Sequence, residues 1–220
     1  MIRQFLSLLR KDDLMSQALA ECHEMIDLCH TMVHASMDSL RKREDASTEI
    51  DLAEADRKLN SFERDVRRKV MTHLSLRNNS DVVSGLVLVS VVIDLERIGD
   101  YTKNIHGLAR NHPARLDAGP YEERLQQVEK SALAIFDRTV AAFKEGDSEE
   151  ARQLMEEYKD DISRPYADLE EELVSAKNGL PTSSAVTLAL YLRFLKRIAA
   201  HSRNLISSVV NPFDRIGYSE

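Results

Sequence analysis

The chain has 220 residues and a mass of 25.0 kDa, enough for one large domain or two small ones of roughly 100 residues each. Seven glycines and five prolines are few, which disfavours turn-rich sandwiches and barrels and favours long helices. The formal net charge of −7 argues against nucleic-acid binding, and no segment approaches the roughly 20 apolar residues that span a bilayer. Because no signal peptide with a cleavage site precedes Lys11, we expect a soluble, cytoplasmic protein.

The first half of the sequence predicts three helices. Apolar residues recur at three- and four-residue spacing from about residue 13 to 43 and again from 52 to 74. A third apolar segment, from Val82 to Leu108, is rich in β-branched residues but too long for a strand, so we predict a helix buried on most sides. The string Asn78-Asn79-Ser80-Asp81 before it supplies turn and N-cap chemistry. Residues 113–120 are expected to form a linker.

The second half repeats this plan. A helix is predicted from 121 to 145, where Gly146 ends it and Asp147 or Ser148 caps the next one. That helix is expected to reach about residue 177, with Pro165 kinking it or ending its first segment. After Asn178-Gly179-Leu180-Pro181, a last helix is predicted to open at Ser183 or Ser184 and to run to about residue 210.

An internal repeat relates the two halves. The string Leu95-Glu96-Arg97-Ile98-Gly99-Asp100 is matched by Leu195-Lys196-Arg197-Ile198-Ala199-Ala200, which implies two copies of one three-helix unit of about 100 residues. We therefore predict an all-α protein of two tandem three-helix bundles. The first bundle covers residues 1–113 and the second covers 114–220.

A candidate metal site follows from the spacing of acids in the first half. Glu96 and Asp100 are four residues apart, so their carboxylates share one face of a helix. In an antiparallel hairpin that turns near residue 78, Asn60 faces Glu96 and Asp56 faces Asp100, with Glu63 one turn further along. Crowded carboxylates usually need a cation or shared protons. We call Asp56, Asn60, Glu96 and Asp100 the acidic patch, and predict that it binds a metal ion.

The second half lacks such a patch. Its corresponding positions are Lys159, Ser163, Lys196 and Ala200, which include no acid. The sequence therefore predicts at most one metal patch, on the first bundle. The alternative interpretation of the acidic patch is a solvated helix face with Arg97 and Lys103 as ordinary salt-bridge partners.

The first predicted helix carries a rival set of metal ligands. His23, Asp27, His30 and His34 form one stripe at four-, three- and four-residue spacing, and His30 with His34 can bind a transition metal together. The alternative is a polar flank in which the histidines cover the edge of the core.

Two cysteines lie on the face of this helix that carries its apolar residues. Cys22 and Cys29 are seven residues apart, which places them about 10 Å apart along a helix axis and too far for a disulfide. We expect two buried free thiols.

Two motifs of the first half resemble the PhoU family of phosphate-uptake regulators. The string of residues 95–100 followed by Asn104-Ile105 is similar to the family's third-helix motif, and Asp56-Arg57-Lys58-Leu59-Asn60 is similar to its second-helix motif. The resemblance implies two three-helix bundles with iron or zinc clusters on the acidic motifs, here Asp56, Asn60, Glu96 and Asp100. It also implies a cytoplasmic, dimeric regulator that binds a membrane phosphate transporter or its associated histidine kinase at the inner face of the membrane.

Two other functions are weighed against this one. The first is a metal-free helical adaptor, in which the acids are merely surface. The second is a carboxylate-bridged di-iron oxidase, but these enzymes use Glu-x-x-His motifs, and Gly99 stands three residues after Glu96. Since no phosphate loop, H-E-x-x-H motif or recognisable nucleophile is present in the sequence, we do not expect an enzyme.

Overall fold

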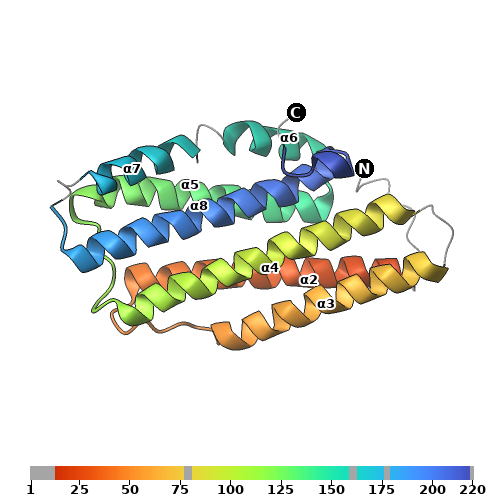
Figure 1. Cartoon of the computed structure of the whole chain (residues 1–220), viewed down its shortest axis with the longest axis horizontal. Helices are drawn as coiled ribbons and strands as arrows, with labels where there is room; N and C mark the ends of the chain where they lie inside the picture. Colours follow the sequence, from red (N-terminus) through yellow and green to blue (C-terminus); the bar gives the residue numbers. More distant parts are fainter. Residues whose placement is uncertain (1–12, 77–80, 159–162, 176–178, 219–220) are drawn as a thin grey trace.

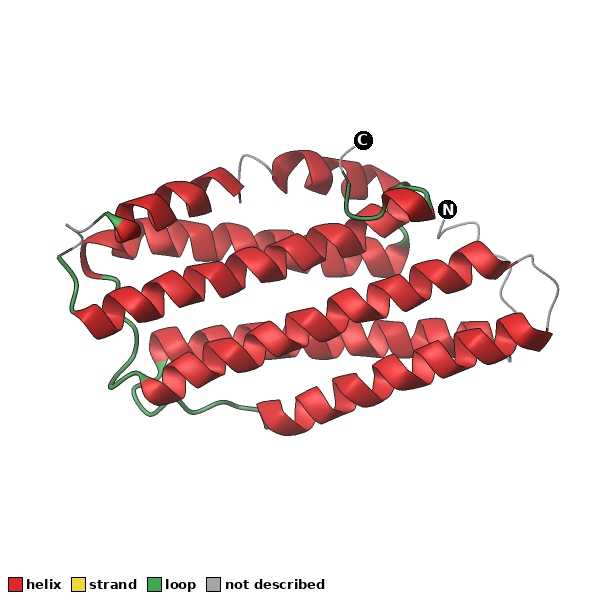
Figure 2. Ribbon diagram, in the orientation of Figure 1, coloured by secondary structure: helices red, strands yellow, loops and turns green. Residues whose placement is uncertain are grey.

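The computed structural model describes residues 13–76, 81–158, 163–175 and 179–218, and every regular element among them is helical (Figure 2). Short 3₁₀ segments occur at Gly119–Tyr121 and Phe213–Arg215. The α-helices in these ranges, labelled as in Figure 1, are α2 (Leu14–Lys42), α3 (Leu52–Leu76), α4 (Val82–Asn111), α5 (Glu122–Glu145), α6 (Ser148–Glu157), α7 (Arg164–Val174) and α8 (Thr182–Val210).

The helices form two bundles that lie side by side. Helices α2, α3 and α4 pack on one another in the first bundle, and α5, α6 and α7 pack around α8 in the second. Helices α4 and α8 run next to each other through the middle of the molecule and join the bundles (Figure 1), and α2 also contacts α5. The prediction of two tandem three-helix bundles is confirmed, with α6 and α7 together in the place of one helix.

Helix α4 is the helix whose β-branched residues made its assignment ambiguous. Val91, Val92, Leu95 and Ile98 are fully buried because α2, α3 and α8 all pack against α4. A helix covered on several sides has no need of a wide polar face. The predicted buried central helix is therefore confirmed, and it belongs to an apolar core that continues through both bundles.

The helix ends follow local side-chain chemistry. Gly146 adopts φ 65°, and Asp147 then accepts hydrogen bonds from the backbone N–H groups of Glu149 and Glu150 at 3.0 and 3.1 Å. These contacts confirm the predicted break and cap between α5 and α6. Pro165 lies in the first turn of α7, where a missing N–H is tolerated. The predicted helix is divided near this proline, since α6 ends at Glu157 and α7 begins at Arg164.

Other boundary expectations differ or lie outside the described residues. Asp81 precedes α4 but makes no side-chain cap, because its carboxylate lies 2.8 Å from Nε2 of His73 on α3 instead. Helix α8 begins at Thr182, directly after Pro181, and not at a serine. The penultimate helix ends at Val174, with Ser175 extended, and not near residue 177. The predicted turn residues 78–80 and residue 178 are outside the described ranges.

Both cysteines are buried free thiols, as predicted. Cys29 Sγ donates a hydrogen bond to the carbonyl oxygen of Leu95 at 3.2 Å, which links α2 to α4. Burial raises the pKa of the Cys22 thiol to about 12, so this thiol stays protonated and unreactive at neutral pH. Within the described ranges, none of the helices combines the length and apolar character needed to cross a bilayer.

Candidate metal centre

Helices α3 and α4 form the antiparallel pair that carries the acidic patch. They pack closely at Gly99, where an added Cβ would lie 2.4 Å from Cδ1 of Leu59. Asp56 and Asn60 lie on α3, and Glu96 and Asp100 lie on α4. The predicted packing of these two helices on each other is confirmed, whereas the pairing of Asn60 with Glu96 stays a prediction.

A lysine connects the two helices within the patch. Lys103 Nζ lies 2.8 Å from Oδ1 of Asp56 and 2.9 Å from Oδ1 of Asp100. Asp56 and Asp100 are thereby brought together around one ammonium group. Arg97 lies at the outer side, 3.3 Å from Oδ2 of Asp100 and 3.6 Å from Oε2 of Glu96. Arg97 and Lys103 thus make the salt bridges that the alternative interpretation expects.

Asn60 supports Asp56 from one turn further along α3. Its Nδ2 donates to Oδ2 of Asp56 at 3.3 Å. An asparagine that donates through its amide nitrogen keeps both lone pairs of its carbonyl oxygen for another partner. Asn60 can therefore act both as a support for Asp56 and as an oxygen ligand.

Glu96 is the acid of the patch whose pKa is raised. Partial burial raises the pKa of its carboxyl group, and the neighbouring carboxylates of Asp100 and Glu63 raise it further against the opposing effect of Arg97. The charged form of Glu96 is disfavoured first by the loss of hydration on burial and then by the carboxylates around it.

The residues of the patch fit a cation in their chemistry. Three carboxylates and one amide carbonyl are oxygen ligands of the kind that hard and borderline cations prefer. The side chains of the three acids are only 16 to 30% exposed, so their charges are partly shielded from water. The ammonium of Lys103 occupies the space between Asp56 and Asp100, and an ion bound by both would have to displace it.

The corresponding face of the second bundle has a different character. Lys196 Nζ lies 3.8 Å from Oε2 of Glu170, Ala200 offers no ligand, and Ser163 directly precedes α7. Lys159 lies outside the described residues. Helix α8 therefore presents a lysine and an alanine where α4 presents two acids.

The histidine stripe of α2 does not form a single group. The ring of His23 meets the edge of Phe143 at 6.1 Å, and Asp27 pairs with Lys144 at 2.7 Å. His30 and His34 instead both contact Asp137, a residue of α5 that sequence analysis did not select. His30, His34 and Asp137 each offer one ligand atom, and these three atoms lie within 4.8 Å of one another. Among the described residues, the three acids of the acidic patch do not come this close together.

A second polar group also escaped sequence analysis. Asp94 of α4 accepts hydrogen bonds from Nδ1 of His201 at 2.7 Å and from Nδ2 of Asn204 at 3.0 Å, both on α8. Asp94 and His201 are each 9% exposed. The signal in the sequence was an acid at an otherwise apolar position of the central helix.

Comparison with known proteins identifies the architecture. The PhoU domain model matches residues 22–108 and 125–209, one match for each bundle. The crystal structure of PhoU from Pseudomonas aeruginosa superposes with a TM-score of 0.77 at 21% identity, covering 91% of this chain and 97% of that one. That of the phosphate transport system regulatory protein PhoU from Streptococcus pneumoniae gives 0.70 at 18% identity, covering 89% and 93%. A search of curated proteins found no match.

Proposed function

The chain belongs to the PhoU domain family, and on this premise we propose that it regulates a phosphate transport system by binding other proteins. The observation that carries the proposal is the match of both repeats to the family model, together with a likeness to PhoU structures over most of the chain. The partner is a membrane phosphate transporter or its associated histidine kinase, contacted from the cytoplasmic side by a homodimer. Membership in a regulatory family argues against the di-iron oxidase.

The proposal includes a metal ion, iron or zinc, on the acidic patch of the first bundle. It is supported by the three carboxylates that α3 and α4 carry and by the raised pKa of Glu96, to which burial contributes most and the carboxylates of Asp100 and Glu63 add. A multivalent cation supplies the charge that one ammonium does not. Lys103, which pairs with Asp56 and Asp100, would compete with such an ion for these two carboxylates.

The mechanism follows from the position of the patch. Asp56 and Asn60 on one helix and Glu96 and Asp100 on the other hold α3 and α4 in a fixed register when they share a ligand. Fixing the register of two helices fixes the outer face that they present to a partner. The metal, when bound, supplies charge neutralisation and a cross-link, and the helices supply the recognition surface.

The first experiment tests the metal. Purified wild-type protein and the double variant Glu96→Gln with Asp100→Asn are analysed for iron and zinc, with Asp65→Asn as the control because Asp65 is an acid of α3 that pairs with Arg68 at 2.7 Å. We expect metal in the wild type and the control and its loss in the double variant. Equal, near-zero metal in all three contradicts the metal part of the proposal.

The second experiment tests the regulatory role. The gene is deleted in its native cell, and phosphate uptake is measured before and after reintroduction of the wild type or the double variant. We expect deregulated uptake in the deletion strain and restored control with the wild type. The partner is then identified by mass spectrometry of proteins that co-purify from the membrane fraction. Unchanged uptake in the deletion strain rules out the proposed role.

A metal-free adaptor is the second candidate, and Lys103 favours it, because a single ammonium already bridges Asp56 and Asp100. A metal that binds only the folded state contributes stability, so the two candidates differ in how the protein responds to a chelator. An unchanged melting temperature after chelation, together with normal phosphate control by the double variant, supports the adaptor.

A further inference from the structure

Three metal-ligand side chains meet where the first bundle contacts the second. His30 and His34, one turn apart on α2, place Nε2 at 2.9 and 3.2 Å from Oδ1 of Asp137 on α5. We propose that these three residues, the histidine group, form a binding site for one divalent transition-metal ion of the Zn²⁺ class, which links the two bundles. The site shares no residue with the acidic patch, and the proposal does not depend on the function proposed above.

The spacing of the donor atoms suits such an ion. In a tetrahedral zinc site with bonds of 2.0 to 2.1 Å, the ligand atoms lie about 3.3 Å from one another. The two Nε2 to Oδ1 separations are close to this value, and all three donor atoms lie within 4.8 Å of one another. Entry of an ion therefore needs small side-chain movements, for which there is room, because the three side chains are 39 to 45% exposed.

The identity of the ligands selects the metal. Two imidazoles and one carboxylate favour Zn²⁺, Co²⁺ or Ni²⁺, whereas Mg²⁺ and Ca²⁺ prefer oxygen ligands throughout. Three protein ligands leave a fourth position for water, as in sites where the ion exchanges or reacts. The histidine group and the oxygen-rich acidic patch thus have different metal preferences, and this difference allows them to be tested separately.

The surrounding residues hold the imidazoles in place. The ring of His30 stacks on Phe136 with centroids 6.0 Å apart, and Phe136 is buried next to Asp137 in the chain. The rings of His30 and His34 lie 4.7 Å apart. Restricted rings lose less freedom when they bind a ligand, so this packing favours binding.

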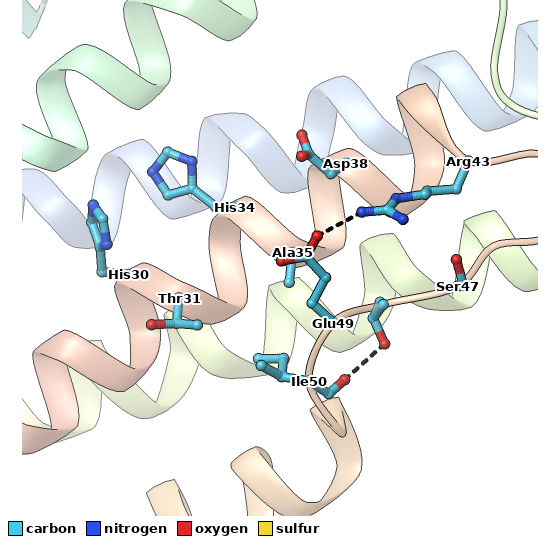
Figure 3. Close-up of a pocket in the computed structure, with 10 residues that line it drawn as sticks. His30, Thr31, His34, Ala35, Asp38, Arg43, Ser47, Glu49 and Ile50 are labelled. Atoms are coloured by element: carbon cyan, nitrogen blue, oxygen red, sulfur yellow. Dashed lines mark hydrogen bonds and ion pairs between the residues drawn. The ribbon is translucent and has the colours of Figure 1, made fainter.

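A surface pocket gives the ion and its water a route to the histidines. The pocket has a volume of about 330 Å³ and lies between α2 and the loop of residues 43–50, with His30 and His34 at one end (Figure 3). Asp38, one turn after His34 on α2, also lines it and pairs with Lys42 at 2.7 Å. Arg43 and Glu49 of the lining pair with each other at 2.8 Å (Figure 3). The charges along the pocket are therefore paired, and the attraction for a cation comes from the three ligand side chains themselves.

The position of the site gives the ion a structural role. Asp137 belongs to the second PhoU repeat and the two histidines belong to the first. Helices α2 and α5 are already joined one turn away by the ion pair of Asp27 with Lys144. An ion on the histidine group adds a coordinate cross-link to this contact and ties the relative position of the two bundles to the available metal.

The test uses the full chain, stripped with a chelator and dialysed. Titration with Co²⁺ should give one equivalent with the intense visible absorption of a tetrahedral complex, and Zn²⁺ should displace it. His34→Gln and Asp137→Asn should each weaken Zn²⁺ binding by more than about tenfold, measured by calorimetry. Asp137→His, which supplies an imidazole ligand at the position where Asp137→Asn lacks one, should show the Co²⁺ spectrum of the wild type. Circular dichroism verifies that each variant is folded.

Two controls separate this site from its neighbours. His23→Gln, on the same stripe but against Phe143, should bind Zn²⁺ like the wild type. The double variant Glu96→Gln with Asp100→Asn should keep the Co²⁺ spectrum, so a failure of the acidic patch leaves this result unaffected. The proposal is overturned when Asp137→Asn titrates like the wild type, or when the acidic-patch variant alone abolishes the spectrum.

Discussion

Glycine at position 99 is set by the closeness of α3 and α4. A Cβ added at Gly99 would lie 2.4 Å from Cδ1 of Leu59, a fully buried side chain with little space to move into. Gly107, on the same helix, has nothing within 4 Å of an added Cβ. The same substitution by alanine can therefore be compared at a crowded position, Gly99, and at an open one, Gly107.

We predict that Gly99→Ala and Gly107→Ala change stability in opposite directions. Alanine gains about 1 kcal/mol over glycine in a helix, but overpacking a core costs about 1 to 3 kcal/mol. Gly107→Ala should therefore raise the free energy of unfolding and Gly99→Ala should lower it, as measured by urea denaturation. Equal stabilisation by both variants would show that α3 and α4 do not pack as closely as described.

Glu96→Gln is predicted to stabilise the protein by an amount that depends on pH. Partial burial and the carboxylate of Asp100 raise the pKa of Glu96 in the folded state, so stability is lost as pH rises through that raised pKa. Glutamine avoids this loss. In metal-free protein, Glu96→Gln should melt above the wild type at about pH 8, and the difference should shrink towards zero as pH falls to about 4. A variant that melts below the wild type at both pH values would contradict this account.

At the scale of the elements, Asp94 joins α4 to α8. It accepts hydrogen bonds from His201 and Asn204, and Arg197 extends the group by contacts with Nε2 of His201 and the hydroxyl of Tyr101. The contact is buried and lies between the bundles. It therefore fixes how one central helix sits against the other, in addition to the apolar packing around it.

Removal of this acceptor should be costly. Asp94→Ala leaves the His201 and Asn204 donors without their shared carboxylate, which costs about 1 to 3 kcal/mol for buried groups. Asp65→Ala is the matched control, since Asp65 forms an exposed pair with Arg68 worth less than about 1 kcal/mol. Urea denaturation measures both, and equal effects would show that the α4–α8 contact is held by apolar packing alone.

The success of sequence reasoning depended on the distance along the chain between the elements concerned. Helices α3 and α4 follow each other in the chain, separated only by residues 77–81, so helical periodicity and the position of the predicted turn suffice to bring Asp56 towards Asp100. The partner of His30 lies 107 residues away on α5, where no local rule gives the register, because docking of the two bundles is decided by side-chain packing. Lys103 was expected as a salt-bridge partner, but its bridging of two helices depends on where a long flexible side chain settles.

At the scale of the whole molecule, the α2–α5 contact is the second connection between the bundles. Its ion pairs differ in burial along its length. Lys144 and Asp27 are 36 and 56% exposed, whereas the Arg41 side chain is 9% exposed and lies 2.5 Å from Glu122 and 2.8 Å from Glu129. Glu129 also accepts the hydroxyl of Tyr191 on α8 at 2.7 Å. Arg41 therefore ties the first bundle to α5, and Glu129 connects this contact to α8.

Arg41→Ala should destabilise the protein far more than Lys144→Ala does. Loss of one partner from a buried ion pair costs about 3 to 5 kcal/mol, against less than about 1 kcal/mol for an exposed pair. Because the lost contact lies between the bundles, calorimetry should show a broadened or divided transition for Arg41→Ala where the wild type gives one.

Burial raises the pKa of Glu129, and without Arg41 its carboxylate loses an opposing charge, so the Arg41→Ala variant should lose stability as pH rises. Adding Glu129→Gln, which removes the charge and keeps an acceptor for Tyr191, should recover part of the loss and flatten this pH dependence. If Arg41→Ala and Lys144→Ala melt alike at every pH, the buried pair does not hold the bundles together.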